Sequence, residues 1–346
     1  MEIGSEFWVE RDYICDPLEQ FYSSGRSALN AIILDVKQRY GIEQVLLPSY
    51  CCDSMIIPFV MNLIRVRFYD VKLNIDRKIS VEIPNAEKNE ALFLMHYFGA
   101  RIDDLRICGN PSDWAAVIVD GTHSFFSDFL CGLEQEYYFV SFRKWFAVTG
   151  IAMAKSRTDK LLFPDESHTE YVRLRNEAFE NKLRFIKGES SDKKVFLDKF
   201  GQAELLLEKD CNCYTPDVKD YFRLQNNILH KDDIVSTRRA NARALISGLC
   251  DIEHLSVIVN FDLDTDCPLF VPVVETTGRR NELRKHLIDN KIYCPVHWPV
   301  SYYHKGMNDD VQEIYNNELS LVCDQRYTVD DMNRIIECIN KFYIEN

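Results

Sequence analysis

Two segments of the sequence place polar side chains directly after short apolar runs. Asp120 closes the run 115–119 and is followed three residues later by His123, and Lys144 follows the run 137–141 among aromatic neighbours. If the two runs are neighbouring strands, these residues lie at the edge of the sheet where open α/β folds bind ligands. A lysine in partly apolar surroundings is less stable as an ammonium, so its amine is available to attack a carbonyl. The pattern indicates Schiff-base chemistry at Lys144.

A carboxylate upstream of such a lysine is what pyridoxal phosphate (PLP) requires, because it keeps the pyridine nitrogen protonated and the ring an electron sink. A hydrogen bond of this charged kind contributes about 1.5–3 kcal/mol. The run Ser24-Gly25-Arg26-Ser27 opens an expected helix and offers free backbone N–H groups, hydroxyls and a guanidinium, as an anion site needs. Each feature alone has an ordinary explanation, a helix cap for Asp120 and a turn for the glycine. The three features occur along the chain in the order phosphate loop, Asp120 and Lys144, and this order favours a PLP site.

The elements that must position these residues follow an α/β pattern. Six runs, several of them apolar almost without alternation, are expected to be strands buried on both faces. They are residues 45–47, 65–69, 91–97, 115–119, 137–141 and 151–154. Apolar residues at helical spacing predict a helix over 26–40, entered from the serine and glycine run.

The second half of the chain predicts a charged helical region and then a smaller unit. Residues 166–210 are strongly charged and predict surface helices. Further helices are predicted at 232–249, 279–290 and 329–343, with a strand at 269–274. We place a domain boundary near residue 230, so that 1–230 form a large PLP-binding domain and 231–346 a small C-terminal α+β domain. Residues 296–301 are expected to return to the junction.

Six short motifs, in order, resemble the DegT/DnrJ/StrS-type sugar aminotransferases, a family of fold-type-I PLP-dependent enzymes. They are GSEFW (4–8), SGRSAL (24–29), LPSY (47–50), HYFG (96–99), VDGTH (119–123) and SFRK (141–144). Residues 319–327 are similar to the family's LSLPCDQRY segment, with Val322 in place of proline. The resemblance spans nearly the whole chain and rests on the order and spacing of the motifs.

The resemblance implies a role for each site residue. Lys144 forms the Schiff base and moves a proton between cofactor and substrate, Asp120 pairs with the pyridinium nitrogen, and His123 lies near the phenolic oxygen of the ring. The phosphate contacts fall to Gly25, Arg26, Ser27 and Ser141. The implied fold is α/β, with a mainly parallel seven-stranded sheet and a small C-terminal α+β domain. Members are homodimers with active sites at the subunit interface.

The sequence departs from the family pattern at several positions. Arg26 stands where threonine is usual, which replaces a hydroxyl with a full positive charge. Cys52 occupies the position of an aromatic residue that stacks on the ring, so Tyr50, His96 and Cys52 all remain candidates for that role. The segment after the lysine keeps one glycine, Gly150, in place of a pair, and no Asn-Tyr-Arg segment follows it.

Two other groups have more than one interpretation. His297 and Trp298 either line the substrate cleft or pack at the domain junction. Arg238 and Arg239, on the helix predicted at 232–249, are more often a solvated or dimer-contacting face than a carboxylate receptor.

Composition excludes several function classes. The 346 residues carry a formal net charge of −13, which disfavours nucleic acid and anionic membranes as partners. The 12 cysteines include no CxxC pair and the 8 histidines no HExxH motif, so no metal site is expected and the thiols are expected to be free. The chain shows no signal-peptide pattern and no apolar stretch long enough to span a membrane, so a soluble, cytoplasmic protein is predicted.

The sequence thus predicts a ping-pong aminotransferase. Glutamate or a similar amino acid gives its amino group to the cofactor, which passes it to a nucleotide-linked keto-sugar. The implied context is surface-polysaccharide biosynthesis. Because a lysine stands at 144, the resemblance disfavours the family's dehydratases, which carry histidine there. Two alternatives remain: a PLP-dependent amino-acid lyase or desulfurase, and a non-catalytic PLP-binding regulatory protein on the same fold.

Overall fold

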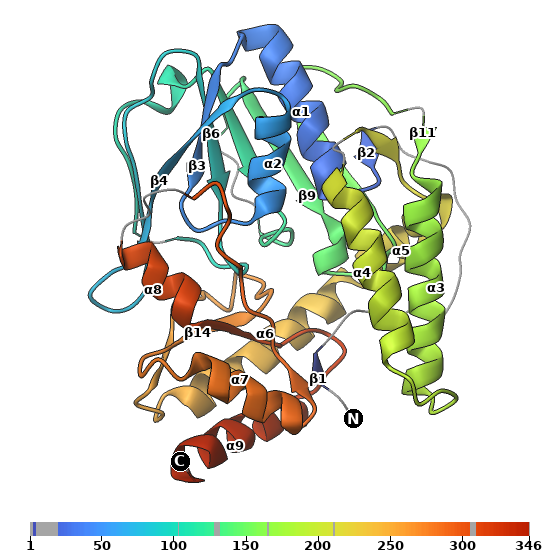
Figure 1. Ribbon diagram of the computed structural model, residues 1–346. Coiled ribbons are helices and arrows are strands. Elements are labelled where there is room, and N and C mark those ends of the chain that lie inside the picture. The colour runs from blue at the N-terminus through green and yellow to red at the C-terminus, as the bar shows by residue number, and fades with distance from the viewer. Residues whose placement is uncertain are drawn as a thin grey trace.

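The computed structural model describes residues 3–4, 20–102, 104–127, 132–164, 166–209, 212–304 and 309–345. A central sheet forms the core of the first half of the chain, and a smaller group of helices and strands lies beneath it in Figure 1. Of the GSEFW motif, the residues after Gly4 lie outside the described residues.

The central sheet contains the six predicted strands and is mostly parallel. Across the described residues its strands run in the order β2-β10-β9-β8-β6-β3-β4-β5-β7. Their bounds are β2 Phe21–Tyr22, β3 Gln44–Pro48, β4 Arg65–Leu73, β5 Ile79–Ile83, β6 Glu90–Met95, β7 Asp104–Ile107, β8 Ala116–Asp120, β9 Glu136–Ser141 and β10 Ala152–Ser156. The seven strands from β2 to β4 give the expected sheet, with β10 antiparallel to both its neighbours.

The sheet is longer than expected by two strands at the β4 edge. β4 continues past Tyr69, and its residues from Asp70 to Leu73 pair antiparallel with β5, which in turn pairs with β7. The addition covers the edge of β4, whose unpaired N–H and C=O groups would otherwise be open to another chain.

The central strands are buried on both faces, as their unbroken apolar runs predict. All residues of β3, β6 and β8 are buried. Helix α1 (Gly25–Tyr40) packs on β9 and β10 and against α2 (Asp53–Met61), as Figure 1 shows. Helix α1 begins one residue before the predicted start and ends where predicted, at Tyr40. The next residue, Gly41, caps the helix in a left-handed conformation.

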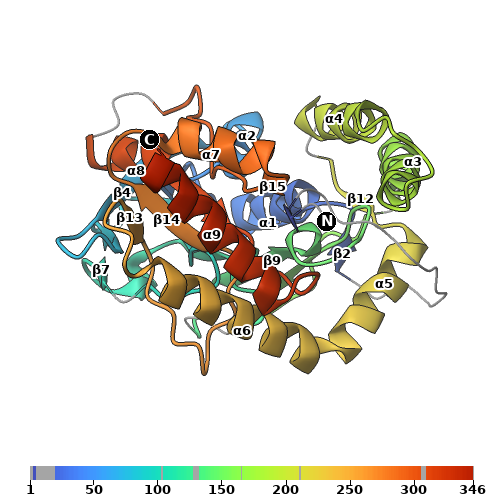
Figure 2. The ribbon, with the colours of Figure 1, turned by 90° about the horizontal axis from the view of Figure 1, so that it is seen from below.

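The second half of the chain contains the helices predicted for it. Helices α3 (Thr169–Ile186) and α4 (Lys194–Lys209) form a hairpin that stands apart from the C-terminal elements in Figures 1 and 2. Helix α5 (Val218–Leu229) precedes α6 (Lys231–Leu249), and the domain boundary predicted near residue 230 falls between these two helices. The boundary itself stays a prediction.

A three-stranded antiparallel sheet, β13-β14-β16, centres the C-terminal part. Its elements are β13 Leu255–Val257, β14 Val271–Glu275, α7 Arg280–Asp289, β15 Ile292–Tyr293, α8 Asp309–Asn317, β16 Glu318–Leu321 and α9 Val329–Glu345. Helix α9 packs along α6 and α7 over this sheet, as Figure 2 shows. The short strand β1 (Ile3–Gly4) pairs with β15. Among the described helices, none is both long and apolar enough to cross a membrane.

Candidate active site

A cavity of about 380 Å³ lies where α1 begins and where β8 and β9 end. Of the predicted site residues, the lining of this first cavity includes Gly25, Arg26, Asp120, His123, Ser141 and Lys144. The sequence therefore identified residues that the fold brings together from three separate segments.

Ser27 is the predicted residue that the structure does not bring into the cavity. Its backbone N–H donates to the Ser24 hydroxyl at 3.1 Å, which caps α1. Its own hydroxyl donates to the carbonyl of Asn212 at 2.8 Å. Both donors of Ser27 therefore already have partners, and its neighbour Ser24 is the serine of this run that lines the cavity.

The start of α1 has the properties of an anion site. The first turn contains no acidic residue, and the backbone dipoles of a 16-residue helix favour negative charge there. Gly25 packs closely on Ser141, since a Cβ at this position would lie 3.0 Å from the Cβ of Ser141, which would have to shift to make room. In the described part of the chain, the Nε of Arg26 is buried and has no hydrogen-bond partner. The guanidinium thus offers an unsatisfied donor beside the cavity.

Asp120 is a buried carboxylate at the end of β8. Its Oδ1 accepts the N–H of Thr122 at 2.8 Å, and the hydroxyl of Thr122 accepts the N–H of Ser141 at 3.1 Å, which ties the ends of β8 and β9 together. Burial raises the pKa of Asp120 to about 6, although Thr122 and the Lys144 charge act in the opposite direction. No helix follows in residues 121–127, so Asp120 caps a turn and not a helix.

His123 is held as a neutral imidazole. Its Nδ1 accepts the N–H of Phe98 at 3.3 Å, which places the ring proton on Nε2. Burial, with a smaller contribution from Lys144, lowers the pKa of His123 to about 3. The ring stacks on Trp298 with centroids 5.5 Å apart and planes 28° apart. His123 can therefore donate a hydrogen bond from Nε2 at any pH at which the protein is folded.

The structure narrows the candidates for the position that faces the cofactor ring. Cys52 lines the first cavity, and Tyr50 and His96 do not. Tyr50 is buried behind Trp298, with ring centroids 5.1 Å apart. Trp298 comes from the C-terminal part and also lines the cavity, as does Glu204 from α4. Sequence reasoning missed Glu204, because nothing in the pattern of α4 distinguishes it from other surface acids.

Lys144 ends the single turn η2 (Phe142–Lys144) after β9, and its side chain is exposed. The expectation of partly apolar surroundings is therefore wrong, because the aromatic neighbours in the sequence point into the core and not toward the amine. Phe142 and Trp145 are buried, whereas Lys144 lines the first cavity and also a second one of about 340 Å³. Lys144 therefore borders both cavities.

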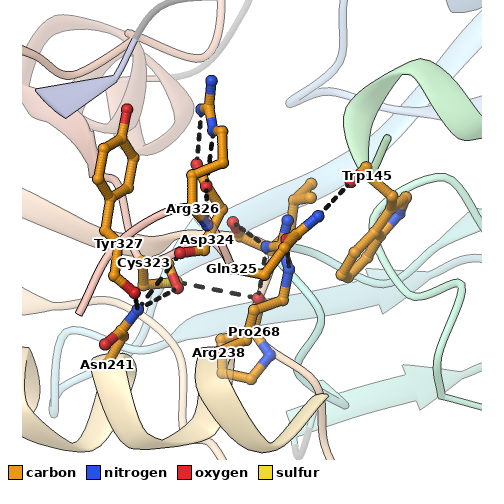
Figure 3. Close-up of polar contacts among 10 residues, drawn as sticks. Trp145, Arg238, Asn241, Pro268, Cys323, Asp324, Gln325, Arg326 and Tyr327 are labelled. Carbon is orange, nitrogen blue, oxygen red and sulfur yellow. Dashed lines mark hydrogen bonds and ion pairs between the residues drawn. The ribbon is translucent and has the colours of Figure 1, made fainter. Parts of the chain in front are cut away.

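Trp145 fixes the backbone next to this lysine. Its indole N–H donates to the carbonyl of Thr122 at 2.7 Å, and its own carbonyl accepts the side-chain amide of Gln325 at 2.8 Å. Figure 3 shows Arg238 beside these residues, donating to Gln325 at 2.8 Å and to the carbonyl of Pro268 at 3.1 Å. The guanidinium also lies 4.6 Å from the Trp145 ring.

These contacts correct the interpretation of Arg238 as a solvated or dimer-contacting residue. Its exposed fraction is 0%, and its hydrogen bonds join α6 to the LSLVCDQRY segment. In that segment Asn241 donates to the carbonyl of Tyr327 at 2.9 Å, and Asp324 pairs with Arg326 at 2.7 Å (Figure 3). The segment therefore supports the lysine turn from the C-terminal part of the chain.

The residues that follow the lysine turn are held by Asp220 on α5. This buried carboxylate accepts the N–H of Thr149 at 2.9 Å, the N–H of Gly150 at 2.8 Å and the hydroxyl of Thr149. It also pairs with Arg223 at 3.0 Å. Gly150 is the one glycine kept from the family's pair, and a Cβ there would lie 2.3 Å from the carbonyl oxygen of Ser23.

The second cavity lies between the lysine turn and the C-terminal part. Its lining is rich in cationic groups and includes His297. The arginines are Arg143, Arg238, Arg284 and Arg326. His297 and Trp298 each line a cavity, and each packs in an aromatic cluster with His123, so the two interpretations are compatible and both stay predictions.

Solved structures similar to this chain include a sugar aminotransferase, a further aminotransferase and a dehydratase. The sugar aminotransferase CalS13 from Micromonospora echinospora is 12% identical, with 93% of this chain and 86% of that chain covered and a TM-score of 0.61. The aminotransferase from Psychrobacter cryohalolentis is 12% identical, with 94% and 87% covered and a TM-score of 0.63. The GDP-4-keto-6-deoxy-D-mannose-3-dehydratase of E. coli, solved with hydrated PLP, is 13% identical, with 92% and 86% covered and a TM-score of 0.61. No family model and no curated protein matches the sequence.

Proposed function

We propose that this protein, which has the fold shared by those aminotransferases and the dehydratase, is a PLP-dependent aminotransferase that acts on a keto-sugar. The observation that carries the proposal is the first cavity. It joins an anion site with an unsatisfied arginine donor, a buried carboxylate and an accessible lysine within one space of about 380 Å³.

The residues present fit the cofactor part by part. Arg26 and the first-turn N–H groups of α1 would hold the phosphate, and Ser141 lies against Gly25 at the same point. The Asp120 carboxylate would hold the pyridine nitrogen protonated, and the N–H of His123 would donate to the phenolic oxygen. When bound, PLP supplies an electron sink that stabilises negative charge on the substrate carbon. Lys144 would hold the cofactor and move the proton at that carbon.

We further propose that glutamate is the amino donor and that a nucleotide-linked keto-sugar is the acceptor, in the synthesis of a surface polysaccharide. The resemblance of six motifs supports this choice, as does the similarity of the fold to that of a solved sugar aminotransferase. A cytoplasmic homodimer is proposed on the same basis. The net charge of −13 disfavours nucleic acid and anionic membranes as partners. Among the described residues, no helix is both long and apolar enough to cross a membrane.

The test is an absorbance spectrum of protein purified with PLP, before and after addition of glutamate. The wild type is expected to show the visible band of lysine-bound cofactor and to lose it when glutamate is added. Lys144→Ala is expected to show neither, while Lys194→Ala, which changes an exposed lysine on α4, behaves like the wild type. A normal lysine-bound band in Lys144→Ala refutes the assignment. Bound cofactor that no amino acid converts would favour the regulatory alternative, and release of pyruvate or sulfide without an acceptor would favour a lyase.

A further inference from the structure

A buried chain of three polar groups runs from β16 to the second cavity. Glu318 opens β16 with an exposed fraction of 0%, and its Oε2 accepts the backbone N–H of His297 at 2.7 Å. Its Oε1 lies 2.5 Å from the hydroxyl of Ser320, and that hydroxyl lies 2.8 Å from Nδ1 of His297. A carboxyl group, a hydroxyl and an imidazole are therefore hydrogen-bonded in series.

The outer end of this chain faces the site. His297 lines the second cavity beside Lys144, and its Nδ1 is committed to Ser320, so Nε2 is the ring nitrogen that can meet a ligand. Burial, and to a smaller degree the charges of Lys144 and His123, lower the pKa of His297 well below its usual value. The imidazole is therefore neutral and carries one proton, which sits on either Nδ1 or Nε2.

The position of that proton depends on the charge of Glu318. The His297 N–H occupies Oε2, so a proton on the carboxyl group must sit on Oε1 and point to Ser320. Ser320 then donates to Nδ1, and the imidazole proton sits on Nε2. When Glu318 is ionised, Oε1 accepts from Ser320, whose oxygen accepts from Nδ1–H, and Nε2 is bare. A hydroxyl has one proton to donate, which is why the two ends of the chain change together.

The surroundings of Glu318 favour its neutral form at pH 7. Burial raises its pKa to about 8, against the opposing effects of Ser320, the His297 N–H and the charge of Arg280. Arg280 donates to the backbone oxygen of Glu318 at 2.7 Å. The other titratable groups whose pKa values Glu318 influences are Tyr50 and Cys294, and burial raises the pKa of both. Tyr50 and Cys294 are therefore both neutral below pH 9, and neither adds a charge beside Glu318 in that range.

We propose that Glu318, Ser320 and His297 form a proton relay that determines whether the Nε2 of His297 donates or accepts a hydrogen bond in the cavity beside Lys144. At neutral pH, Nε2–H is a donor and suits an oxygen with lone pairs, such as a substrate carbonyl or carboxylate. Above the pKa of Glu318, the bare Nε2 suits a hydroxyl or ammonium donor instead. His297 is thereby a specificity-determining residue, and Glu318 and Ser320 are positioning residues. The ligand assignment rests on the proposed function, whereas the relay itself does not.

The relay is tested on the cofactor-free protein by 15N-detected NMR of histidine-labelled samples. The His297 signals are identified by their loss in His297→Gln. In the wild type, the proton is expected on Nε2 at pH 7 and on Nδ1 at pH 9.5, and the midpoint reports the ionisation of Glu318. A His297 tautomer that does not change across this range overturns the proposal, whatever the protein catalyses.

Variants separate a relay from a merely structural contact. Glu318→Gln keeps an acceptor for the His297 N–H and a donor for Ser320, so the proton is expected to stay on Nε2 at both pH values. Ser320→Ala is expected to uncouple the tautomer from pH while Glu318 still ionises. Glu275→Gln changes another fully buried carboxylate, on β14, and is expected to titrate like the wild type. Loss of the transition in Glu275→Gln would also overturn the assignment to Glu318.

Turnover gives a second reading that depends on the proposed function. In the wild type, KM for the substrate that meets His297 is expected to rise at least tenfold between pH 7 and 9.5, with a smaller change in kcat. Glu318→Gln is expected to remove most of that rise. An NMR transition without a KM change in either substrate would keep the relay and refute the contact between His297 and substrate.

Discussion

Asp220 should be a main support of the segment that follows Lys144, although it lies on α5, far away in sequence. The carboxylate accepts hydrogen bonds from two backbone N–H groups and a hydroxyl, and it neutralises Arg223. Both Asp220 and Arg223 are buried, with exposed fractions of 0% and 7%. We therefore expect Asp220→Ala to destabilise the whole fold and not only the segment.

The magnitude follows from what the substitution leaves behind. A buried N–H without a partner costs about 1–3 kcal/mol, and Asp220→Ala leaves two of them, on Thr149 and Gly150. Removing one partner of a buried ion pair costs about 3–5 kcal/mol. These costs overlap because the site relaxes as a unit, so we expect a loss of about 4–6 kcal/mol. Asp220→Asn keeps one acceptor oxygen but presents an amide to the N–H of Gly150, for which we expect a loss of about 2–3 kcal/mol.

Urea unfolding followed by circular dichroism measures these losses. Asp217→Ala is the matched control, because Asp217 caps the same helix from a half-buried position and should cost only about 1 kcal/mol. The loss of free energy of unfolding should be largest for Asp220→Ala, smaller for Asp220→Asn and smallest for Asp217→Ala. If Asp220→Ala lost no more free energy of unfolding than Asp217→Ala, the carboxylate would not be the support that its four partners suggest.

Three further predictions concern the charges of the site. Arg26→Met should weaken PLP binding by roughly 10- to 150-fold, because it removes one charged hydrogen bond of about 1.5–3 kcal/mol. Lys37→Met, on the same helix, should leave PLP binding unchanged. Fluorescence titration with PLP measures both affinities. Asp120→Asn should weaken PLP binding by a similar factor. In the wild type, protonation of Asp120 near pH 6 removes the negative charge that pairs with the pyridinium nitrogen, so PLP affinity should fall below that pH. Asp120→Asn should abolish this pH dependence of PLP affinity. For Glu318, the raised pKa means that the folded state binds more protons than the unfolded state between about pH 4.5 and 8, so its contribution to stability falls as pH rises through that window. Chemical unfolding at pH 6 and pH 9 should therefore show a smaller decline in Glu318→Gln than in the wild type, and an equal decline would contradict the assignment.

The sequence predicts the sheet and half of the site for a physical reason. Parallel strands buried on both faces need unbroken apolar runs, and such runs are visible without any knowledge of the fold. A polar residue directly after such a run must lie at a strand end, which is how Asp120 was predicted, whereas Ser141 was implied only by the resemblance of the SFRK motif. The two extra strands, β5 and β7, were missed because they lie at the edge of the sheet, where charged residues interrupt the apolar pattern, as in ISVEI and DLRI.

The other half of the site comes from tertiary contacts that no local pattern encodes. Trp298 reaches the first cavity from the C-terminal part, and Asp220 and Glu204 reach the lysine turn from helices α5 and α4. The exposure of Lys144 was mispredicted for the same reason. Aromatic neighbours in sequence indicate burial of the backbone, but successive side chains of a tight turn point in different directions. Phe142 and Trp145 fill the core while Lys144 projects outward.

This arrangement separates the two demands that the proposed reaction makes on the lysine. A residue that bonds a cofactor and then moves a proton needs a fixed backbone and an amine that can change position. The backbone after the lysine is fixed by Trp145, whose indole and carbonyl are both bonded, and by Asp220 through Thr149 and Gly150. Before the lysine, the N–H of Ser141 is bonded to the hydroxyl of Thr122. Lys144 lines both the first cavity, which Arg26 and Asp120 also line, and the cationic second cavity, which His297 also lines. Hydrogen bonds to its neighbours therefore hold the backbone of the turn, while the lysine side chain is exposed and can move.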